Sequence, residues 1–338
     1  MFRALAGLAL AASLASPAVA HQPELPVGNC INMGNHLEAF PTEGSWRGKR
    51  IEATDFARIR AAGFETVRIP VRWLNKSGAE PPHAIDPAWL ERVGEVVDWA
   101  LAADLKVLLN SHHFESVHEN PAAAQDHLAA VWAQIAAYFA GRPDDRLWFE
   151  IENEPHDRFT NALIVPTLSP ALAEIRKVSP DRPVIIGGEN WSGIDSLATL
   201  DMPDDPHVYP TFHYYEPFDF THQGASWVEA DFPLGREYGR EADRERLVRD
   251  VAKVRAYVAR TGKVPFMGET GAHTTVPLSD RIAYHRAVRD AFAGEVSGIC
   301  AWGYTNTFEF WDQEQGEWLP GLLEAFLHRE GYQSPAGE

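Results

Sequence analysis

The sequence has 338 residues, with 48 Asp and Glu against 30 Lys and Arg, and carries a formal net charge of −18 at pH 7. An acidic surplus of this size disfavours nucleic acid and anionic membrane surfaces as partners, because both repel negative charge. A neutral substrate fits better, and the eleven Trp residues offer flat faces that suit sugar rings as well as hydrophobic cores.

The first twenty residues have the pattern of a secretory signal peptide. Arg3 precedes an apolar run from Ala4 to Leu14, and Ala18-Val19-Ala20 forms an A-x-A cleavage pattern. The run is too short to span a bilayer, and no later segment of about 20 apolar residues follows it. We therefore expect residues 21–338 to be one mature domain, secreted or periplasmic, monomeric and without a membrane partner.

Short apolar runs then alternate with amphipathic segments, which is typical of repeated βα units. The predicted strands are 30–34, 66–70, 106–110, 147–151, 183–187, 208–213, 264–268 and 298–302. The predicted helices between them are 55–62, 86–103, 125–139, 171–178, 241–260 and 280–292, with a short one at 196–200. Eight strands with intervening helices predict an α/β fold, a single (β/α)8 TIM barrel whose active site lies at the C-terminal ends of the strands. No glycine-rich phosphate fingerprint follows the first strand, so we expect no nucleotide cofactor.

The two cysteines, Cys30 and Cys300, fall in predicted strands that are neighbours in a closed barrel. A disulfide requires Cα atoms within about 7 Å and suitable side-chain directions, which spacing along the chain does not reveal. Two cysteines also make no dense disulfide framework of the kind found in small exported proteins. We therefore expect two buried free thiols, with a bond between them as the alternative.

Polar residues follow most of the predicted strands, at the ends that form the active face of such a barrel. These residues, with Arg68 inside the second strand and one aromatic residue at the eighth, are Asn35, Glu38, Arg68, His112, His113, Asn153, Glu154, His213, Tyr215, Glu269 and Trp302. Glu154 and Glu269 close the fourth and seventh strands. Two carboxyl groups at one pocket mouth meet the chemical need of a glycosidase, which uses one protonated acid and one ionised nucleophile or base.

Seven stretches resemble glycoside hydrolase family 5, in family order and over nearly the whole mature chain. They are "INMGNHLEA" (31–39), "GFETVRIPVRW" (63–73), "LLNSHHFE" (108–115), "FEIENEP" (149–155), "FHYYEPFDFTHQGASW" (212–227), "FMGETGA" (266–272) and the segment around Trp302. The resemblance implies that Glu154 is the general acid/base and Glu269 the nucleophile of a double displacement that retains the anomeric configuration. The two carboxyl groups should then lie about 5 to 5.5 Å apart.

The resemblance also implies roles for the neighbouring residues. Arg68 and Tyr215 are expected to contact the nucleophile, and Asn153 the 2-hydroxyl group of the sugar. The remaining assignments are His112 or His113, with His213, lining the reactive subsite, Trp302 as its aromatic floor, and Asn35 and Glu38 as further sugar ligands. No cofactor is implied.

The stretch "FEIENEP" places three carboxyl groups at alternate positions, which strict strand geometry would direct to one face. We expect Glu150 to lie deeper than Glu154, held by a cation such as Arg68 or His112. The role of Glu152 is open. One hypothesis is that an ionised, partnered Glu152 near the rim changes the pKa of Glu154 by like-charge proximity.

The stretch "HHFESVH" (112–118) gathers potential metal ligands, but consecutive strand residues diverge and no H-E-x-x-H spacing occurs. We therefore expect no catalytic metal, and leave a structural calcium ion open. Among the tryptophans, the expected packing residues are Trp89, Trp99 and Trp132, and the expected sugar platforms are Trp73, Trp191, Trp227, Trp302 and Trp311.

The resemblance favours an endo-acting β-1,4-glucanase, with a β-mannanase or a broad glucan and mannan hydrolase as the second candidate. Gly303 departs from the similar endoglucanases, in which a polar side chain is common, so a sugar contact is missing there. A silent carbohydrate-binding barrel is the rival class, but it need not keep Glu154, Glu269 and Arg68 together.

Overall fold

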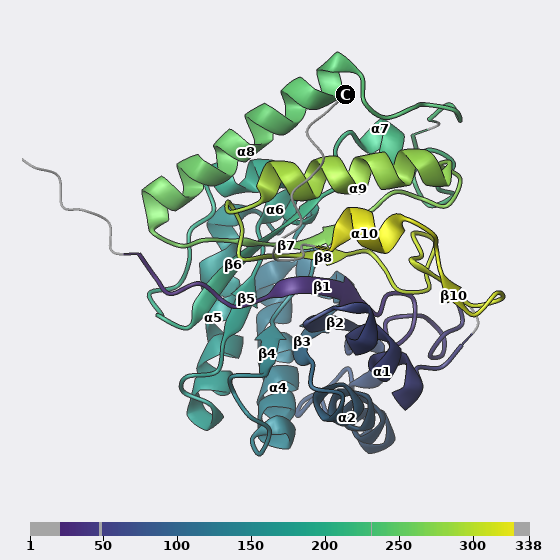
Figure 1. The fold of residues 1–338 in the computed structure, drawn as a ribbon. Coiled ribbons are helices and arrows are strands. Elements are labelled where there is room, and N and C mark those ends of the chain that lie inside the picture. The colour runs from purple at the N-terminus through teal and green to yellow at the C-terminus, as the bar shows by residue number, and fades with distance from the viewer. Residues whose placement is uncertain (1–20, 47–48, 231, 328–338) are drawn as a thin grey trace, which may run out of the picture.

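The strands close into a parallel barrel in the order β1 to β8, as predicted (Figure 1). The computed structural model describes residues 21–46, 49–230 and 232–327, so the expected signal peptide at 1–20 lies outside the described residues. The strands are β1 (Gly28–Asn32), β2 (Thr66–Val71), β3 (Lys106–Ser111), β4 (Leu147–Glu150), β5 (Val184–Ile186), β6 (Val208–Tyr214), β7 (Phe266–Thr270) and β8 (Gly298–Ala301). Each overlaps its predicted range. Strand β7 begins and ends two residues later than predicted, which places Glu269 within the strand.

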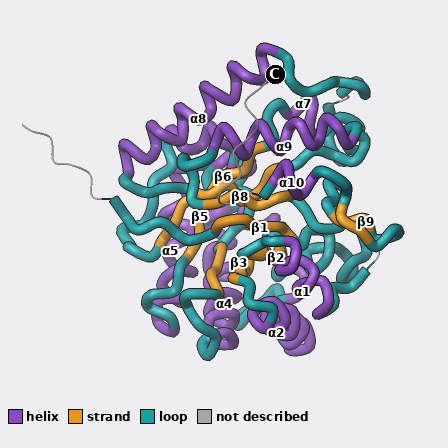
Figure 2. Tube along the Cα trace, in the orientation of Figure 1, coloured by secondary structure: helices purple, strands orange, loops and turns teal. Residues whose placement is uncertain are grey.

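Helices surround the barrel, as the tube coloured by secondary structure makes clear (Figure 2). The longer ones are α1 (Ala53–Ala62), α2 (Pro87–Ala102), α4 (Pro121–Phe139), α5 (Asn161–Val178), α8 (Glu241–Thr261) and α9 (Leu278–Phe292). The shorter elements are η1 (Leu74–Lys76), α3 (Glu115–Glu119), α6 (Glu189–Ser192), η2 (Ile194–Ala198), α7 (Phe218–Thr221), α10 (Leu322–Phe326) and the hairpin β9 (Trp311–Asp312) and β10 (Glu317–Trp318). Helix α5 starts ten residues before its predicted start, because it continues through Pro166 and Pro170 while it packs along α4.

Several helix ends have identifiable capping interactions. Asp86 accepts a hydrogen bond from a backbone N–H at the start of α2, and Gly63 ends α1 with a φ of 110°. Asp55 lies in the first turn of α1 and accepts from the backbone N–H of Glu52, which completes a capping box. Asp280 also lies inside a first turn, that of α9, and so is not the N-cap residue.

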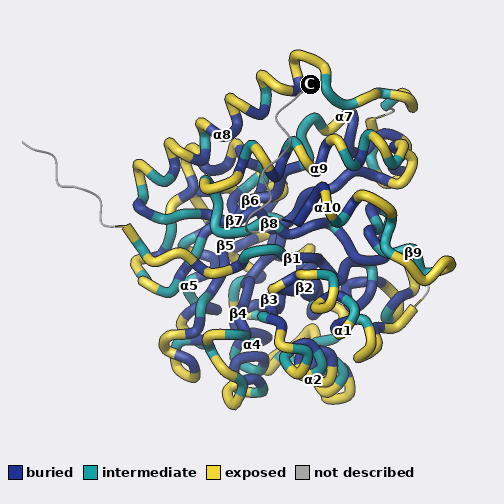
Figure 3. Tube along the Cα trace, viewed as in Figure 1, coloured by how far each residue is buried: buried dark blue, intermediate teal, exposed yellow. Residues whose placement is uncertain are grey.

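The barrel strands are mostly buried (Figure 3). Alternate positions along them build two separate hydrophobic cores. The core inside the barrel consists of Leu25, Val27, Cys30, Leu108, Trp148, Ile185, Phe266 and Cys300. The much larger core between barrel and helices takes the intervening positions, such as Ile31, Val107 and Leu109. This period of two then directs the next inward positions toward the C-terminal mouth, where polar residues replace the apolar layer.

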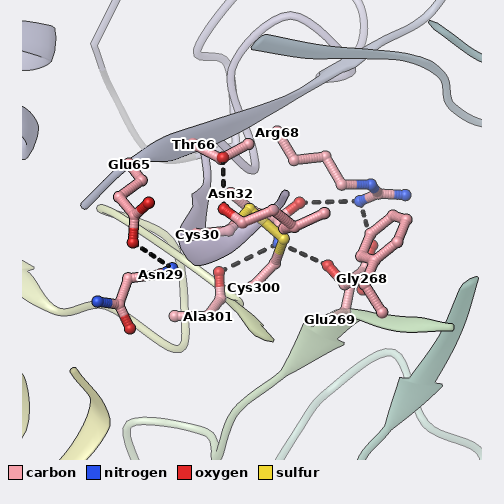
Figure 4. Close-up of a disulfide and its surroundings, with 12 residues drawn as sticks. Asn29, Cys30, Asn32, Glu65, Thr66, Arg68, Gly268, Glu269, Cys300 and Ala301 are labelled. Atoms are coloured by element: carbon pink, nitrogen blue, oxygen red, sulfur yellow. Dashed lines mark hydrogen bonds and ion pairs between the residues drawn. A yellow bond between two sulfur atoms is a disulfide. The ribbon is translucent and has the colours of Figure 1, made fainter. Parts of the chain in front are cut away.

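The expectation of free thiols at Cys30 and Cys300 is wrong. The two residues are direct register partners across β1 and β8, with Cα atoms 4.1 Å apart, and their sulfur atoms are bonded. Barrel closure makes neighbours of residues that are 270 positions apart in the sequence. The bond lies beneath the polar layer, near Asn32 and Glu269 (Figure 4).

Among the residues that the structure describes, no helix combines the length and apolar character needed to cross a membrane.

Trp73, expected as a sugar platform, is fully buried and donates its indole N–H to the carbonyl oxygen of Asn110. That expectation is therefore wrong, because the residue lies on the packed side of the loop after β2.

Candidate active site

Arg68 organises the polar layer above the inner core. Its guanidinium is fully buried and donates from Nε and Nη2 to both carboxylate oxygens of Glu150, at 2.6 and 2.9 Å. The Nη1 group donates to Asn32 at 2.8 Å and to Glu269 at 2.7 Å, and Nη2 also donates to Asn153. Since a buried cation needs several partners to offset its desolvation, this set of hydrogen bonds explains why Arg68 is tolerated there.

Glu269 is held on both carboxylate oxygens. Arg68 donates to Oε1, and the hydroxyl group of Tyr215 donates to Oε2 at 2.9 Å. Both predicted partners of this carboxyl group are therefore in place. A direct cation and a phenol donor stabilise the ionised form.

Glu154 lies past the end of β4 and contacts His213 of β6, whose Nδ1 is 2.7 Å from Oε1. One oxygen of Glu154, one oxygen of Glu269 and one ring nitrogen of His213 all lie within 4.8 Å of one another. The side chain of Glu154 is 23% exposed and that of Glu269 only 5%, so Glu154 is the more accessible of the two. The spacing suits direct attack by one carboxylate on a sugar, because inverting enzymes need about 6.5 to 9.5 Å for an intervening water.

Burial and neighbouring groups shift the pKa values of Glu154, Glu269 and His213. Burial raises the pKa of Glu154 to about 7, against the opposing charge of Arg68. Burial also raises the pKa of Glu269, but the charge of Arg68 and the hydrogen bond from the Tyr215 hydroxyl oppose that rise. Burial lowers the pKa of His213 to about 4, so its imidazole is neutral near pH 7. The direct contacts distinguish the two groups, because a guanidinium and a phenol donate to Glu269, whereas Glu154 contacts only the imidazole of His213.

The three carboxyl groups of "FEIENEP" do not share one face, because β4 ends at Glu150 and the chain bends after it. Glu150 is the deep, fully buried partner of Arg68, as predicted. Glu152 is also fully buried, and its Oε1 lies 3.0 Å from Nε2 of His118 in α3. Glu152 therefore lies away from the rim, in contrast to the location that its hypothesis assumed.

Asn153 and His112 form a supporting pair beside the carboxyl groups. The Oδ1 of Asn153 accepts from Arg68, and its Nδ2 lies 3.4 Å from His112 Nε2. The other ring nitrogen of His112 lies 2.9 Å from Asn110 Oδ1. His113 lies edge-on to His112 at 4.5 Å and to Trp46 at 5.7 Å between ring centroids.

Asn35 and Glu38 lie on the loop after β1. The fully buried carboxylate of Glu38 accepts from the backbone N–H groups of Asn35 and His36. Burial raises the pKa of Glu38 to about 7. Glu38 thus fixes the loop that carries Asn35, and the assignment of both residues as sugar ligands stays a prediction.

Trp302 stacks parallel to His112, with 5.8 Å between ring centroids and an interplanar angle of 3°. Gly303 follows it through a cis peptide bond. A Cβ atom at Gly303 would lie 2.5 Å from Nδ2 of the buried Asn306, so no larger residue fits in this packing. A Cβ atom at Gly34 would likewise meet the Trp302 ring at 2.7 Å.

Several further aromatic side chains are exposed on the loops of the active face. Trp191 and Trp227, both predicted platforms, are 54% and 55% exposed. Phe40 and Trp46 on the loop after β1 are exposed as well, and they line a pocket with Arg72, Asn75 and Glu115. Sequence reasoning missed this pair, although its place directly after the matched stretch 31–39 could have indicated it.

Sequence reasoning also missed Asn32, which lies one strand period after Cys30. Its Oδ1 accepts from Arg68 while its Nδ2 donates to the carbonyl oxygens of Gly268 and Ala301. Asn32 thus ties β1 to β7 and β8 directly under Glu269. The alternation of inward positions in the first strand is the signal that could have found it.

Within the described residues, one cluster has the ligand spacing of a metal site, and it is the set Glu154, His213 and Glu269. Arg68 already neutralises Glu269 by direct contact, which disfavours a divalent cation beside it. The predicted absence of a catalytic metal stays a prediction. Of the "HHFESVH" ligands, His113 contacts the rings of His112 and Trp46, whereas His118 contacts Glu152.

A (β/α)8 barrel that presents two carboxyl groups at this short spacing, one of them bonded directly to a buried guanidinium, has the site required of a retaining glycoside hydrolase. The chain belongs to glycosyl hydrolase family 5, since the family's Cellulase pattern matches residues 30–307. It is 36% identical over 265 residues to Endoglucanase H of Acetivibrio thermocellus, an alignment that covers 78% of this chain and 28% of that protein. The chain thus spans less than a third of this curated relative.

Solved structures with the same fold include two of Thermotoga maritima Cel5A. The complex with cellobiose is 35% identical, with a TM-score of 0.85 and coverage of 89% of this chain and 97% of that chain. The complex with mannotriose is also 35% identical, with a TM-score of 0.86 and coverage of 90% and 98%. These likenesses agree with the predicted family and fold.

Proposed function

We propose that this protein is a retaining endo-β-1,4-glucanase that cleaves β-1,4-glucan chains by double displacement. The observation that carries the proposal is the spacing of Glu154 and Glu269, since one carboxyl oxygen of each lies within 4.8 Å of the other. The names of the similar proteins support glucan as the substrate, since Endoglucanase H and a cellobiose complex are among them. The exposed aromatic rings on several loops suit an extended chain of sugar rings.

The geometry supports a defined role for each group. Protonated Glu154 gives its proton to the leaving glycosidic oxygen while ionised Glu269 attacks the anomeric carbon, which forms a covalent glycosyl-enzyme. Glu154, now a carboxylate, then removes a proton from water as that water displaces Glu269. Arg68 and Tyr215 hold Glu269 for attack, and Asn153 is assigned to the 2-hydroxyl group of the reacting sugar.

A β-mannanase activity is the second candidate. Glucose and mannose differ in configuration at the 2-position, which Asn153 is proposed to contact, and Thermotoga maritima Cel5A has been solved with mannotriose. Gly303 offers no side chain beside Trp302, so any contact to the neighbouring sugar from this position is absent in both readings.

We further propose export of the mature chain and action as a monomer. The signal-peptide pattern at residues 1–20 supports export. The Cys30–Cys300 bond supports it independently, because disulfides persist in oxidising compartments and are rare in the cytosol. Size-exclusion chromatography of the mature protein tests the monomer directly.

The deciding experiment is a reducing-sugar assay on carboxymethylcellulose, mannan, xylan and xyloglucan, with product-length analysis and NMR of the first anomer released. We expect internal cleavage of the glucan with the β-anomer formed first. Glu154→Gln and Glu269→Gln should each lower turnover by about 10³-fold or more, because each removes a group used in the chemical step. Near-normal turnover in either variant, or release of the α-anomer, would refute the mechanism. No release from any polymer, with tight binding to one, would favour a silent binding barrel.

A further inference from the structure

Glu152 is a buried carboxylate that the reaction above does not use. Its Oε1 lies 3.0 Å from Nε2 of His118, whereas its Oε2 is buried without a hydrogen-bond partner. His118 is itself buried, with a side chain only 5% exposed. A buried ion pair of this kind rarely adds net stability over apolar residues of similar size, so its presence calls for a reason other than packing.

The pair continues as a chain of hydrogen bonds to the acid/base. His118 Nδ1 lies 3.2 Å from His156 Nε2, and His156 Nδ1 lies 2.6 Å from the carbonyl oxygen of Glu154. A carbonyl oxygen only accepts, so His156 Nδ1 carries a proton. His156 Nε2 and His118 Nδ1 then share one proton between them, and His118 Nε2 and Glu152 share another. Glu152, His118 and His156 together thus hold one more proton than a carboxylate and two neutral imidazoles would.

The rings are fixed on both sides. His156 packs against His118 with 3.9 Å between ring centroids, and stacks on Trp191 at 5.0 Å with an interplanar angle of 11°. The backbone N–H of Trp191 donates to the carbonyl oxygen of Pro155. The segment 154–156 therefore packs between His118 of α3 and Trp191 of α6.

We propose that Glu152, His118 and His156 are positioning residues that act through Glu154, by holding its peptide carbonyl and presenting one shared positive charge beside its carboxyl group. The proposal rests on the proposed role of Glu154 as acid/base. It replaces the like-charge hypothesis for Glu152, because the charge that faces Glu154 is that of the imidazoles.

The titration of these groups is consistent with this geometry. Burial opposes a charge on His118, but the hydrogen bond and charge of Glu152 outweigh burial and raise the pKa of His118. The charges of His156 and His118 both act to lower the pKa of Glu154, against the dominant effect of burial. Loss of the shared charge should therefore raise the pKa of Glu154 further.

Other charged and titratable groups also face this region and stay unchanged in the test. They are Arg68 on β2, His112 and His113 after β3, Glu115 on α3, Glu150 on β4, Asp157 beside His156, His213 on β6, Tyr215 after β6, and Glu269 on β7.

The test compares pH profiles of kcat/KM on a soluble β-glucan for three variants. Glu152→Gln and His118→Gln each remove the positive charge shared by the two histidines. The double variant His118→Met with Glu152→Leu replaces the pair by apolar side chains of similar volume, which guards against misfolding. We expect the alkaline limb to move to higher pH by about 0.5 unit or more in all three. Asp205→Asn is the matched control, because it breaks an ion pair with Arg176 before β6 and should lower stability without moving the limb.

A second measurement needs no substrate. It therefore distinguishes failure of the proposed positioning role of Glu152, His118 and His156 from failure of the glucanase assignment. Histidine 15N NMR of the wild-type protein should show His156 protonated at Nδ1, and this signature should change in Glu152→Gln. An alkaline limb that is unchanged, or that moves to lower pH, in the folded apolar double variant would overturn the proposal. So would a His156 ring that carries its proton only at Nε2.

Discussion

The two carboxyl groups of the site differ because of which residues touch them, although both are carboxyl groups of Glu at strand ends. Glu269 receives a guanidinium and a phenol, and Glu154 receives one imidazole that is neutral near pH 7. Burial acts on both, so the direct donors decide which one keeps the proton. The proposed division into acid and nucleophile thus depends on Arg68 and Tyr215.

This division predicts the alkaline limb of the pH profile. Glu154 must be protonated to give a proton to the leaving oxygen, and its pKa is raised to about 7. As the pH rises through about 7, the protonated fraction falls and kcat/KM on polysaccharide should fall with it. The matched measurement uses a dinitrophenyl β-cellobioside, whose leaving group needs no proton. On that substrate the limb should disappear, and a limb that persists at the same pH on both substrates would contradict the role of Glu154.

At the scale of elements, strand and helix ends determine where the site residues lie. Helix α1 ends at Gly63, whose φ of 110° reverses the chain into β2 and so places Arg68 in register with Asn32. Its backbone N–H caps the carbonyl groups of Ile59 and Arg60. A residue with a Cβ atom is strained in this conformation whatever space surrounds it.

Gly63→Ala therefore isolates a conformational cost. The added Cβ atom would meet only Leu327 Cδ1, at an ordinary 3.5 Å, so the expected loss of about 1 kcal/mol in unfolding free energy comes from the backbone. Gly141→Ala is the control, because nothing lies within 4 Å of its Cβ position and its φ is not left-handed. It should be neutral or slightly stabilising in urea denaturation. Equal losses in the two variants would show that the cap conformation is not the cause.

At the scale of the whole molecule, the barrel and most of the site are predictable from local patterns. The alternation of apolar runs indicates eight strands, and the polar residues that follow them include Arg68, Glu154 and Glu269. These residues meet because parallel strand ends share one rim, which requires no knowledge of the loops. Glu150 is predictable for the same reason, as it lies one strand period below the rim on an inward position.

The remaining features depend on distances that the sequence does not contain. The Cys30–Cys300 bond needs the exact register between the first and last strands, which are 270 residues apart. The pairing of His118 with Glu152 needs the path of the loop after β3, and the burial of Trp73 needs the packing after β2. Such contacts follow from tertiary packing and loop geometry, whereas strand and helix patterns report only local periodicity.

The disulfide gives the last prediction, because it joins the first barrel strand to the last. A bond across a loop this long restricts the unfolded chain strongly, and removal of native disulfides typically costs about 2 to 5 kcal/mol. Cys30→Ala with Cys300→Ala also removes two sulfur atoms from the fully buried inner core, which adds to the loss through cavities. Urea denaturation of the wild-type protein with and without reductant separates the two effects, since reduction breaks the bond and keeps the sulfur atoms. We expect both treatments to lower the midpoint, the double variant by more, while kcat in the folded range stays near normal because Asn32 and Arg68 still hold Glu269. An unchanged midpoint after verified reduction would mean that the hydrogen-bonded register of β1 and β8 alone keeps the barrel closed.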